Sequence, residues 1–384
     1  MQNALESFYY EIAEIPKDRV KTAQRSVNRM LELVMPRLRR NRFAFRFGSP
    51  ILSDPLFENL KTISVDSVEV IVPIILPRTH WEPHPTIPGY VRLPLPEVKK
   101  DTLLAENPWR HFKSKDGLYL SPLQVTIVTW ALARDTLVLP WPVKGYEMLP
   151  LRLKNEGCVL LLKDNEIDLT VKMIIGLKFD EKDPCNLYTK PFEDDIDTRS
   201  DEYWRLTFIE NELKILKAIE PADRFRRAQA VKTLCALTKL DPIYKALNDF
   251  QILTVMFNIT DEELHDKTWH KKSLKECFYL LLNKLLFFLK EGNLPHFYIN
   301  NLNLFRTMAL RDKKLLIGRV SFMTQNEKEV IRVCRRRALN YKASLQPPIE
   351  TVIEEYDPAP KGTDLFYEAT DDHLGEEFKV DYHA

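Results

Sequence analysis

Residues 149–179, LPLRLKNEGCVLLLKDNEIDLTVKMIIGLKF, constrain the fold more than any other segment of the chain. Apolar and polar residues alternate along this segment, and the turn-like groups KNEG and KDNE interrupt the alternation. The pattern predicts two or three antiparallel strands. Residues 62–77, TISVDSVEVIVPIILP, predict a further buried strand that carries the carboxylate of Glu69. We therefore expect a sheet in the first half of the chain.

Helices are predicted on both sides of these strands. Apolar residues recur at three-and-four spacing within residues 18–40, and a second helix is expected over residues 122–139. The proline-dense residues 73–96 are expected to form a surface loop and short edge strands, because each proline removes a backbone donor. From Ser200 onward the patterned segments all predict helices, at residues 200–219, 223–240, 241–259, 270–292 and 324–345.

The predicted fold class is α+β, in three parts. Residues 1–199 form a mixed domain with N-terminal helices, residues 200–345 an all-helical lobe, and residues 346–384 an acidic tail. The chain has a net charge of +1, and its tail contains eleven acidic residues and two lysines, so the tail carries −9 and the body +10. The tail is expected to be a disordered solubilising segment, or alternatively to contain a docking peptide at GTDLFYEATDD.

Composition excludes several classes of protein. The five cysteines lie far apart without a CxxC pair, which predicts reduced thiols in a cytosol-facing protein. No stretch reaches the roughly 18 to 20 uncharged residues of a membrane span. The sequence contains neither GxGxxG nor GxxxxGK[ST], which excludes Rossmann and P-loop chemistry.

Other charged clusters leave alternatives open. An acidic group is either a set of metal ligands on one strand or an exposed hairpin face: Asp164, Glu166 and Asp168. Histidine pairs without further zinc ligands are expected to be solvated or capping: His80 with His84, and His265 with His270. Arginine clusters fit a solvated helix face better than a phosphate track, so nucleic acid is not expected as a partner: Arg335, Arg336 and Arg337, and Arg224, Arg226 and Arg227.

Several phrases resemble one family. They are YYEIAEIPKDRVKTAQ, DSVEVIVPIILPRTHW, IPGYVRL, GLYLSP, EYWRLTFIENELKIL and KEGNLPHFYINNLNLFR, in order from about residue 8 to about residue 306. They resemble the male-abnormal (Mab) family of nucleotidyltransferase-fold proteins, which includes cyclic GMP-AMP synthase. The likeness is greater to the mitochondrial dynamics proteins, outer-membrane adaptors that recruit a dynamin-related fission GTPase. The resemblance implies a twisted mixed sheet with flanking helices, followed by a helical lobe.

The resemblance also implies where a catalytic site would lie. Active relatives have a Gly-Ser pair, then two acids on alternate residues of a strand, then a third acid on a later strand. The Gly-Ser pair falls on Asp54 and Pro55, and the first two acidic positions fall on Ser67 and Glu69. The third falls on Lys172, or on Asp168 if the hairpin has another register. No metal or other cofactor is expected, because paired Mg²⁺ ions need converging carboxylates.

Nucleotide and partner sites are implied by the same resemblance. Some mitochondrial dynamics proteins have a nucleotide diphosphate pocket, and its positions here lack the cations that phosphate needs: Pro55, Ser67, Thr207, Ile209 and Cys235. The adaptors bind their partner through a loop that corresponds to residues 92–115. The expected partner-binding residues are Arg92, Lys99, Lys100, Trp109 and Arg110. The alternative is that Trp109 packs on the body and that the lysines are solvated.

The predicted function is a non-catalytic adaptor, a pseudoenzyme that binds a dynamin-related GTPase or another protein. The resemblance implies action at the mitochondrial outer membrane, although the sequence shows no anchor, and a homodimer is compatible with it. The alternative is a metal-dependent nucleotidyltransferase, a sensor of nucleic acid that makes a cyclic dinucleotide.

Overall fold

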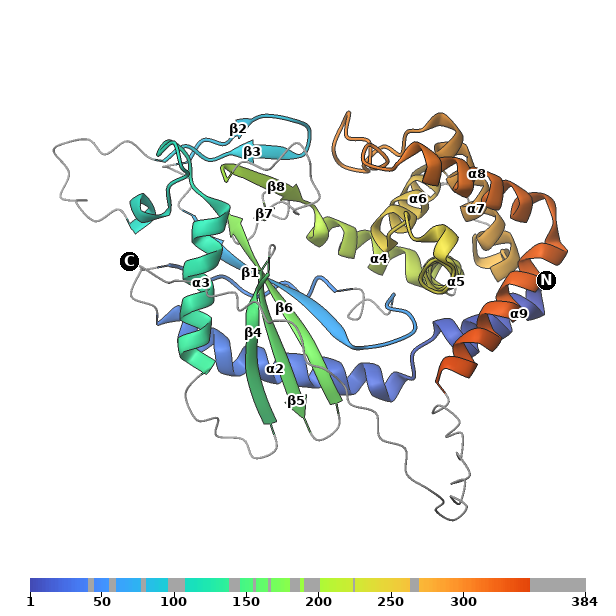
Figure 1. Cartoon of the computed structure of the whole chain (residues 1–384), viewed down its shortest axis with the longest axis horizontal. Coiled ribbons are helices and arrows are strands. Elements are labelled where there is room, and N and C mark those ends of the chain that lie inside the picture. Colours follow the sequence, from blue (N-terminus) through green and yellow to red (C-terminus); the bar gives the residue numbers. More distant parts are fainter. Residues whose placement is uncertain are drawn as a thin grey trace, which may run out of the picture. The chain divides into compact units, whose positions relative to one another are not determined.

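The computed structural model of the chain describes most of its first 345 residues (Figure 1). The described ranges are 1–40, 45–54, 60–76, 81–95, 108–137, 146–154, 157–164, 167–179, 187–189, 201–223, 225–262 and 269–345. Met1–Ala343 form one compact unit, and Ser344–Ala384 form a second.

One sheet contains all eight described strands. They are β1 (Ser67–Ile75), β2 (His84–Pro85), β3 (Tyr90–Arg92), β4 (Tyr146–Lys154), β5 (Gly157–Asp164), β6 (Ile167–Lys178), β7 (Leu187–Thr189) and β8 (Tyr203–Thr207). Their order is β2-β3-β8-β7-β6-β5-β4, and β1 pairs with β6 outside this path. β1 is parallel to β6, whereas β4, β5 and β6 form the antiparallel meander that residues 149–179 predicted. The α+β class with a mixed sheet is therefore confirmed.

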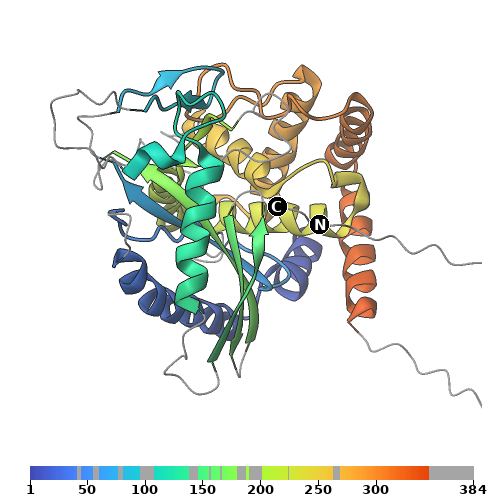
Figure 2. The same cartoon turned by 60° about the vertical axis from the view of Figure 1, so that its left-hand side comes forward.

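The strands of the first half bury one face under two helices. α2 (Lys17–Arg39) contacts β6, and α3 (Pro122–Leu137) contacts β4, β5 and β6, as Figures 1 and 2 show. Alternate β1 residues enter this core, namely Val68, Val70, Val72 and Ile74. Since side chains alternate along a strand, Glu69 and Ile71 project from the opposite face of the sheet. That opposite face holds the candidate site.

The helical half has a separate hydrophobic cluster. Its helices are α4 (Ile209–Asp223), α5 (Arg226–Leu240), η5 (Pro242–Tyr244), α6 (Asp249–Glu262), η6 (Trp269–Lys271), α7 (Leu274–Glu291), α8 (Leu310–Gln325) and α9 (Glu327–Ser344). Helix α7 begins at a capping box between Ser273 and Glu276, and it ends at Gly292, whose φ of 70° suits a residue without Cβ. The N-terminal elements α1 (Gln2–Phe8) and η1 (Tyr9–Ala13) contribute Leu5, Phe8 and Ile12 to this cluster.

In the second half, one prediction was wrong and one helix was missed. Residues 200–219 do not begin as a helix, because Tyr203–Thr207 form β8 between β3 and β7, with Trp204 only 1% exposed. Aromatic residues favour such a half-buried strand, and long-range pairing decides the outcome. The helix α8 was not predicted at all. None of the helices in the described ranges is long and apolar enough to cross a membrane.

Candidate functional site

Glu69 and Lys172 lie opposite each other on the sheet face that α2 and α3 do not cover. The parallel pairing of β1 with β6 places the two residues in register. The Lys172 Nζ lies 3.1 Å from Glu69 Oε1, and the two side chains are 21% and 44% exposed. An ammonium group therefore stands beside the one carboxylate that the catalytic pattern retains. It supplies the positive charge that a divalent ion would otherwise bring.

Asp54 is a structural carboxylate at the beginning of β1. Its side chain is 5% exposed, and both of its oxygens lie 3.2 Å from the Nζ of Lys61. The Asp54 Oδ2 also accepts a hydrogen bond of 3.0 Å from the backbone N–H of Glu69. Lys61 in turn donates to the carbonyl oxygen of Ser67. Sequence reasoning missed Lys61, for which the only signal was a cation seven positions after Asp54.

Ser67 and Asp168 do not join Glu69 in a carboxylate cluster. Ser67 is the exposed first residue of β1 and offers only a hydroxyl. Asp168 is exposed on β6, in register with Lys163, and lies four residues or about 13 Å along the strand from Lys172. Of the two alternatives for the third acidic position, Lys172 is the residue that faces Glu69.

Metal ligands were also considered elsewhere in the sequence. Within the described ranges, no three His, Cys, Asp or Glu side chains converge to hold a metal ion. His84 and His270 are exposed. Other candidates from the sequence lie outside the described residues: His80, Glu166, Arg224 and His265.

An apolar cluster, here called the apolar plug, occupies the same sheet face beside Glu69 and Lys172. It consists of Ile51, Ile71, Ile174 and Leu187, with Ile209 packed against them. The fit is close, because a Cβ at Gly176 would lie 2.8 Å from Leu187 Cδ1 and 3.0 Å from Ile71 Cγ2. Ile209, one of the positions that the resemblance matched to a nucleotide pocket, thus has aliphatic neighbours.

The positions matched to a nucleotide pocket do not form one polar site. Thr207 ends β8 in register with Leu187, and Ile209 belongs to the apolar plug. Cys235 is 2% exposed in the helical cluster, where burial raises the pKa of its thiol. Lys178 of β6, a buried cation, is bound by Glu210 at 2.9 Å. Pro55 lies outside the described residues.

Arg92 has a different, polar environment at the end of β3. Its guanidinium lies 3.0 Å from Glu202 Oε1 and donates a hydrogen bond of 2.7 Å to the hydroxyl of Tyr203. It also lies over the rings of Tyr203 and Tyr119, at 4.8 and 5.3 Å from their centroids. The contacts orient Arg92 while its side chain remains 30% exposed.

Trp109 is part of the core below this surface. The indole is 8% exposed and packs on Phe45, Trp81 and Phe112, with ring centroids 4.9, 5.7 and 6.0 Å away. The packing alternative therefore describes Trp109, which presents little surface to a partner. The side chain of Arg110, and the whole of Lys99 and Lys100, lie outside the described residues.

Two buried titratable groups near β8 were also missed by sequence reasoning. Burial raises the pKa of Glu212 to about 7, against the opposing charge of Arg205. Burial, together with the charge of Arg205, lowers the pKa of His296 to about 4. Because neither residue belongs to a recognisable motif, only the fold reveals that Glu212 is buried and His296 half-buried.

Comparison with known proteins identifies the helical half. Residues 213–321 match the family described as Mab-21 protein HhH/H2TH-like domain. These residues are a Mab-21 domain. The match confirms the resemblance to the Mab family, and it places α5, α6 and α7 within the Mab-21 domain.

Similarity extends beyond the Mab-21 domain into the sheet. The chain is 24% identical to mitochondrial dynamics protein MID51 of Danio rerio over 309 residues, which cover 77% of this chain and 63% of that protein. It is 21% identical to cyclic GMP-AMP synthase of Mus musculus over 349 residues, which cover 80% and 66%. The same enzyme of Sus scrofa is 21% identical over 338 residues, which cover 77% and 65%. The chain thus spans just under two thirds of the length of these relatives.

Proposed function

We propose that this chain is a non-catalytic adaptor with a nucleotidyltransferase fold, which binds a protein partner in mitochondrial dynamics. The observation that carries the first part is the ion pair between Glu69 and Lys172. Transfer of a nucleotidyl group by two metal ions requires carboxylates that hold both ions about 4 Å apart. At the two matched strand positions around Glu69, this chain has a hydroxyl and an ammonium group, Ser67 and Lys172. The ammonium repels the divalent ions that the reaction needs.

The apolar plug supports the same proposal for nucleotide binding. A nucleoside diphosphate needs cations and hydrogen-bond donors around its phosphates. Ile209 and Cys235 provide neither at the matched positions, and the aliphatic side chains around Gly176 leave no room for a further Cβ. We therefore expect no tight binding of ADP or GDP.

An assay of product formation tests the absence of catalysis. The chain is incubated with ATP and GTP, with Mg²⁺ or Mn²⁺, and with or without double-stranded DNA or RNA, and the products are separated by chromatography. Mouse cyclic GMP-AMP synthase serves as the positive control. We expect no metal-dependent product. A cyclic dinucleotide would overturn the proposal and establish the alternative, a nucleic-acid sensor that is an enzyme.

The proposed partner is a dynamin-related GTPase at the mitochondrial outer membrane. Support comes from the similarity to MID51, which is named as a mitochondrial dynamics protein. The proposed contact surface runs from Arg92 into the residues that follow, and it includes Lys99, Lys100 and Arg110. Arg92 is suited to this role because Tyr203, Tyr119 and Glu202 hold it in one orientation.

Capture of a purified dynamin-related GTPase tests the partner and the surface together. We expect Arg92→Ala and Lys99→Glu/Lys100→Glu each to weaken capture about tenfold, as loss of an arginine anchor or reversal of charge does. Lys17→Glu/Lys21→Glu is the matched control, because it reverses two exposed charges on α2. If the parent chain captures no GTPase, the proposed partner is wrong. If the parent chain captures the GTPase and the surface variants retain full capture, the proposed surface is wrong.

A further inference from the structure

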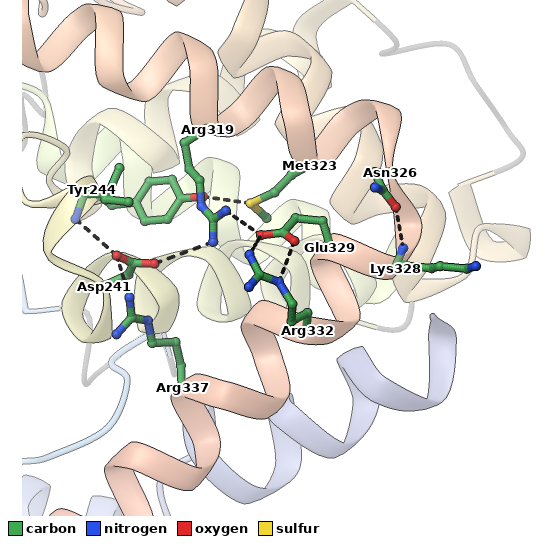
Figure 3. A network of polar contacts seen from close by, with 10 residues as sticks. Asp241, Tyr244, Arg319, Met323, Asn326, Lys328, Glu329, Arg332 and Arg337 are labelled. Carbon is green, nitrogen blue, oxygen red and sulfur yellow. Dashed lines mark hydrogen bonds and ion pairs between the residues drawn. The ribbon is translucent and has the colours of Figure 1, made fainter.

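The charged side chains of helix α9 lie on two different sides of the helix. Glu329 turns toward the rest of the structure, where Figure 3 shows it in a network with arginines. Glu329 is 5% exposed and binds Arg332 at 2.7 Å and Arg319 of α8. Arg337 of α9 binds Asp241, which is 1% exposed, at 2.9 Å. The network fixes the rotation of α9 about its axis.

The other side of α9 retains basic residues without acids. Glu327, the remaining acid of the helix, forms an ion pair with Lys275 of α7. Lys328, Arg335 and Arg336 are exposed, and none of them forms an ion pair with any residue that the structure describes. The inward network thus uses the acids of α9 and leaves a surplus of positive charge outside.

This outer side is also hollowed and partly apolar. A shallow hollow of about 440 Å³ is lined by Lys328, Ile331, Arg332, Arg335, Arg336, Leu339 and Asn340. Leu339 is 68% exposed, and Ile331 is half-buried at the floor. We call Lys328, Ile331, Arg332, Arg335, Arg336 and Leu339 the α9 docking face. From Lys328 to Leu339 it extends about 17 Å along the helix axis.

We infer that the α9 docking face binds an acidic amphipathic helix of a partner protein. Lys328 and Arg336 lie eight residues or about 12 Å apart along α9, with Arg335 beside Arg336, so their charges match carboxylates that are two intervals of four residues apart on a second helix. Arg332, between them, is already bound to Glu329. Between the charges, Ile331 and Leu339 offer aliphatic contacts to the apolar stripe of such a helix. The surface is independent of Arg92 and of the proposed GTPase site.

The chemistry of the face favours a peptide over other anionic partners. Single-stranded nucleic acid is held by aromatic stacking, and the face has no aromatic residue. A phosphate backbone would bury Leu339 without an apolar partner. A planar lipid surface would not enter a hollow, whereas one side chain of a helix would.

Fluorescence anisotropy of labelled synthetic helices tests the inference with the full chain. The probe is a helix of about four turns with glutamates at intervals of four residues and a leucine stripe, and its control has glutamine at each glutamate. We expect the acidic probe to bind at least about tenfold more tightly than the glutamine control, and the difference to shrink in high salt. Equal affinities for the two probes would overturn the inference.

Variants locate the binding. Arg335→Gln/Arg336→Gln and Leu339→Asn should each weaken binding of the acidic probe about tenfold. Both change exposed positions, so thermal unfolding should match that of the parent chain. Arg311→Gln/Lys314→Gln removes two exposed charges from the neighbouring α8 and should leave binding unchanged. Binding that is indifferent to Arg335, Arg336 and Leu339 would refute the assignment.

Two further arms separate other occupants. Duplex DNA and phosphatidylserine vesicles are titrated separately into the complex with the acidic probe. Either one would overturn the inference if it displaces the probe at lower concentrations than unlabelled probe does and if this displacement depends on Arg335 and Arg336. The chain's own acidic residues are tested by Asp364→Asn/Glu368→Gln/Asp371→Asn/Asp372→Asn in the full chain. Unchanged affinity for the probe supports an external partner, and a gain of more than about tenfold would assign the face to the chain itself.

Discussion

Lys232 and Glu14 form a buried ion pair of 2.7 Å across 218 positions of sequence. Lys232 is 1% exposed in α5, and its ammonium also lies 5.5 Å from the centre of the Tyr9 ring. The pair ties the N-terminal elements to the Mab-21 domain, to whose hydrophobic cluster Leu5, Phe8 and Ile12 belong. The first residues of the chain are thus part of the helical core.

Glu14→Ala should lower the free energy of unfolding by about 3 kcal/mol, because it leaves a buried ammonium without its counter-charge. Urea denaturation measures the loss. The double variant Glu14→Ala/Lys232→Met should recover most of it. Glu11→Ala is the matched control, since its exposed pair with Lys342 should contribute less than about 1 kcal/mol. Equal losses for the two single variants would show that burial of Lys232 has no special cost.

Glu212 should make stability depend on pH. Its folded pKa of about 7 lies above the ordinary value of 4.5, so the folded state binds more protons between these values and stability falls as pH rises through this window. Glu212→Gln should therefore be more stable than the parent chain above pH 7, by up to about 3 kcal/mol, and similar to it near pH 4.5. Urea denaturation across the pH range provides the measurement.

His296 should make stability depend on pH in the opposite direction. Its folded pKa of about 4 lies below the ordinary value of 6.5, so the unfolded state binds more protons in between, and stability falls as pH decreases through this window. The two effects partly cancel in the parent chain between pH 4.5 and 6.5. Glu212→Gln should consequently reveal a loss of stability below pH 6.5, which Glu212→Gln/His296→Gln abolishes. An unchanged pH profile in Glu212→Gln would mean that this carboxyl titrates normally.

Ser67→Asp/Lys172→Asp should create affinity for Mn²⁺ on the sheet face around Glu69. The two changes would place carboxylates on either side of Glu69 and remove the competing ammonium. In isothermal titration calorimetry, the double variant should bind Mn²⁺ with a millimolar or lower dissociation constant. This constant should be at least about tenfold lower than that of the parent chain. Lys290→Asp adds a carboxylate on α7 at an exposed position and serves as control. Equal heats for the double variant and the control would contradict the electrostatic argument.

Local patterns predicted the elements whose stability is local. The apolar spacing of residues 18–40 predicted α2, and the short apolar run around Glu69 predicted β1, because each pattern is typical of its own structure. The strand β8 was not predicted, because it depends on pairing with β3, where Trp204 lies in register with Val91, far away in sequence.

The candidate site was predicted unevenly for the same reason. The match of Lys172 to an acidic position followed from the family resemblance, and the parallel register with β1 shows that it faces Glu69. The contact of Lys61 with Asp54 could not be predicted, because it depends on how the chain returns before β1. Trp109 is of a residue type that is common among interface anchors, but it packs on Phe45 and Trp81, which are distant in sequence.

The salt bridge between Glu69 of β1 and Lys172 of β6 fixes the charges on this face of the sheet. A divalent ion dissociates, and its occupancy follows the concentration of free magnesium in the cell. Lys172 is bound covalently to the backbone and cannot be removed by a chelator or diluted. Glu69 therefore has the same neighbour at every magnesium level, and the sheet surface presents one constant charge pattern to whatever protein approaches it.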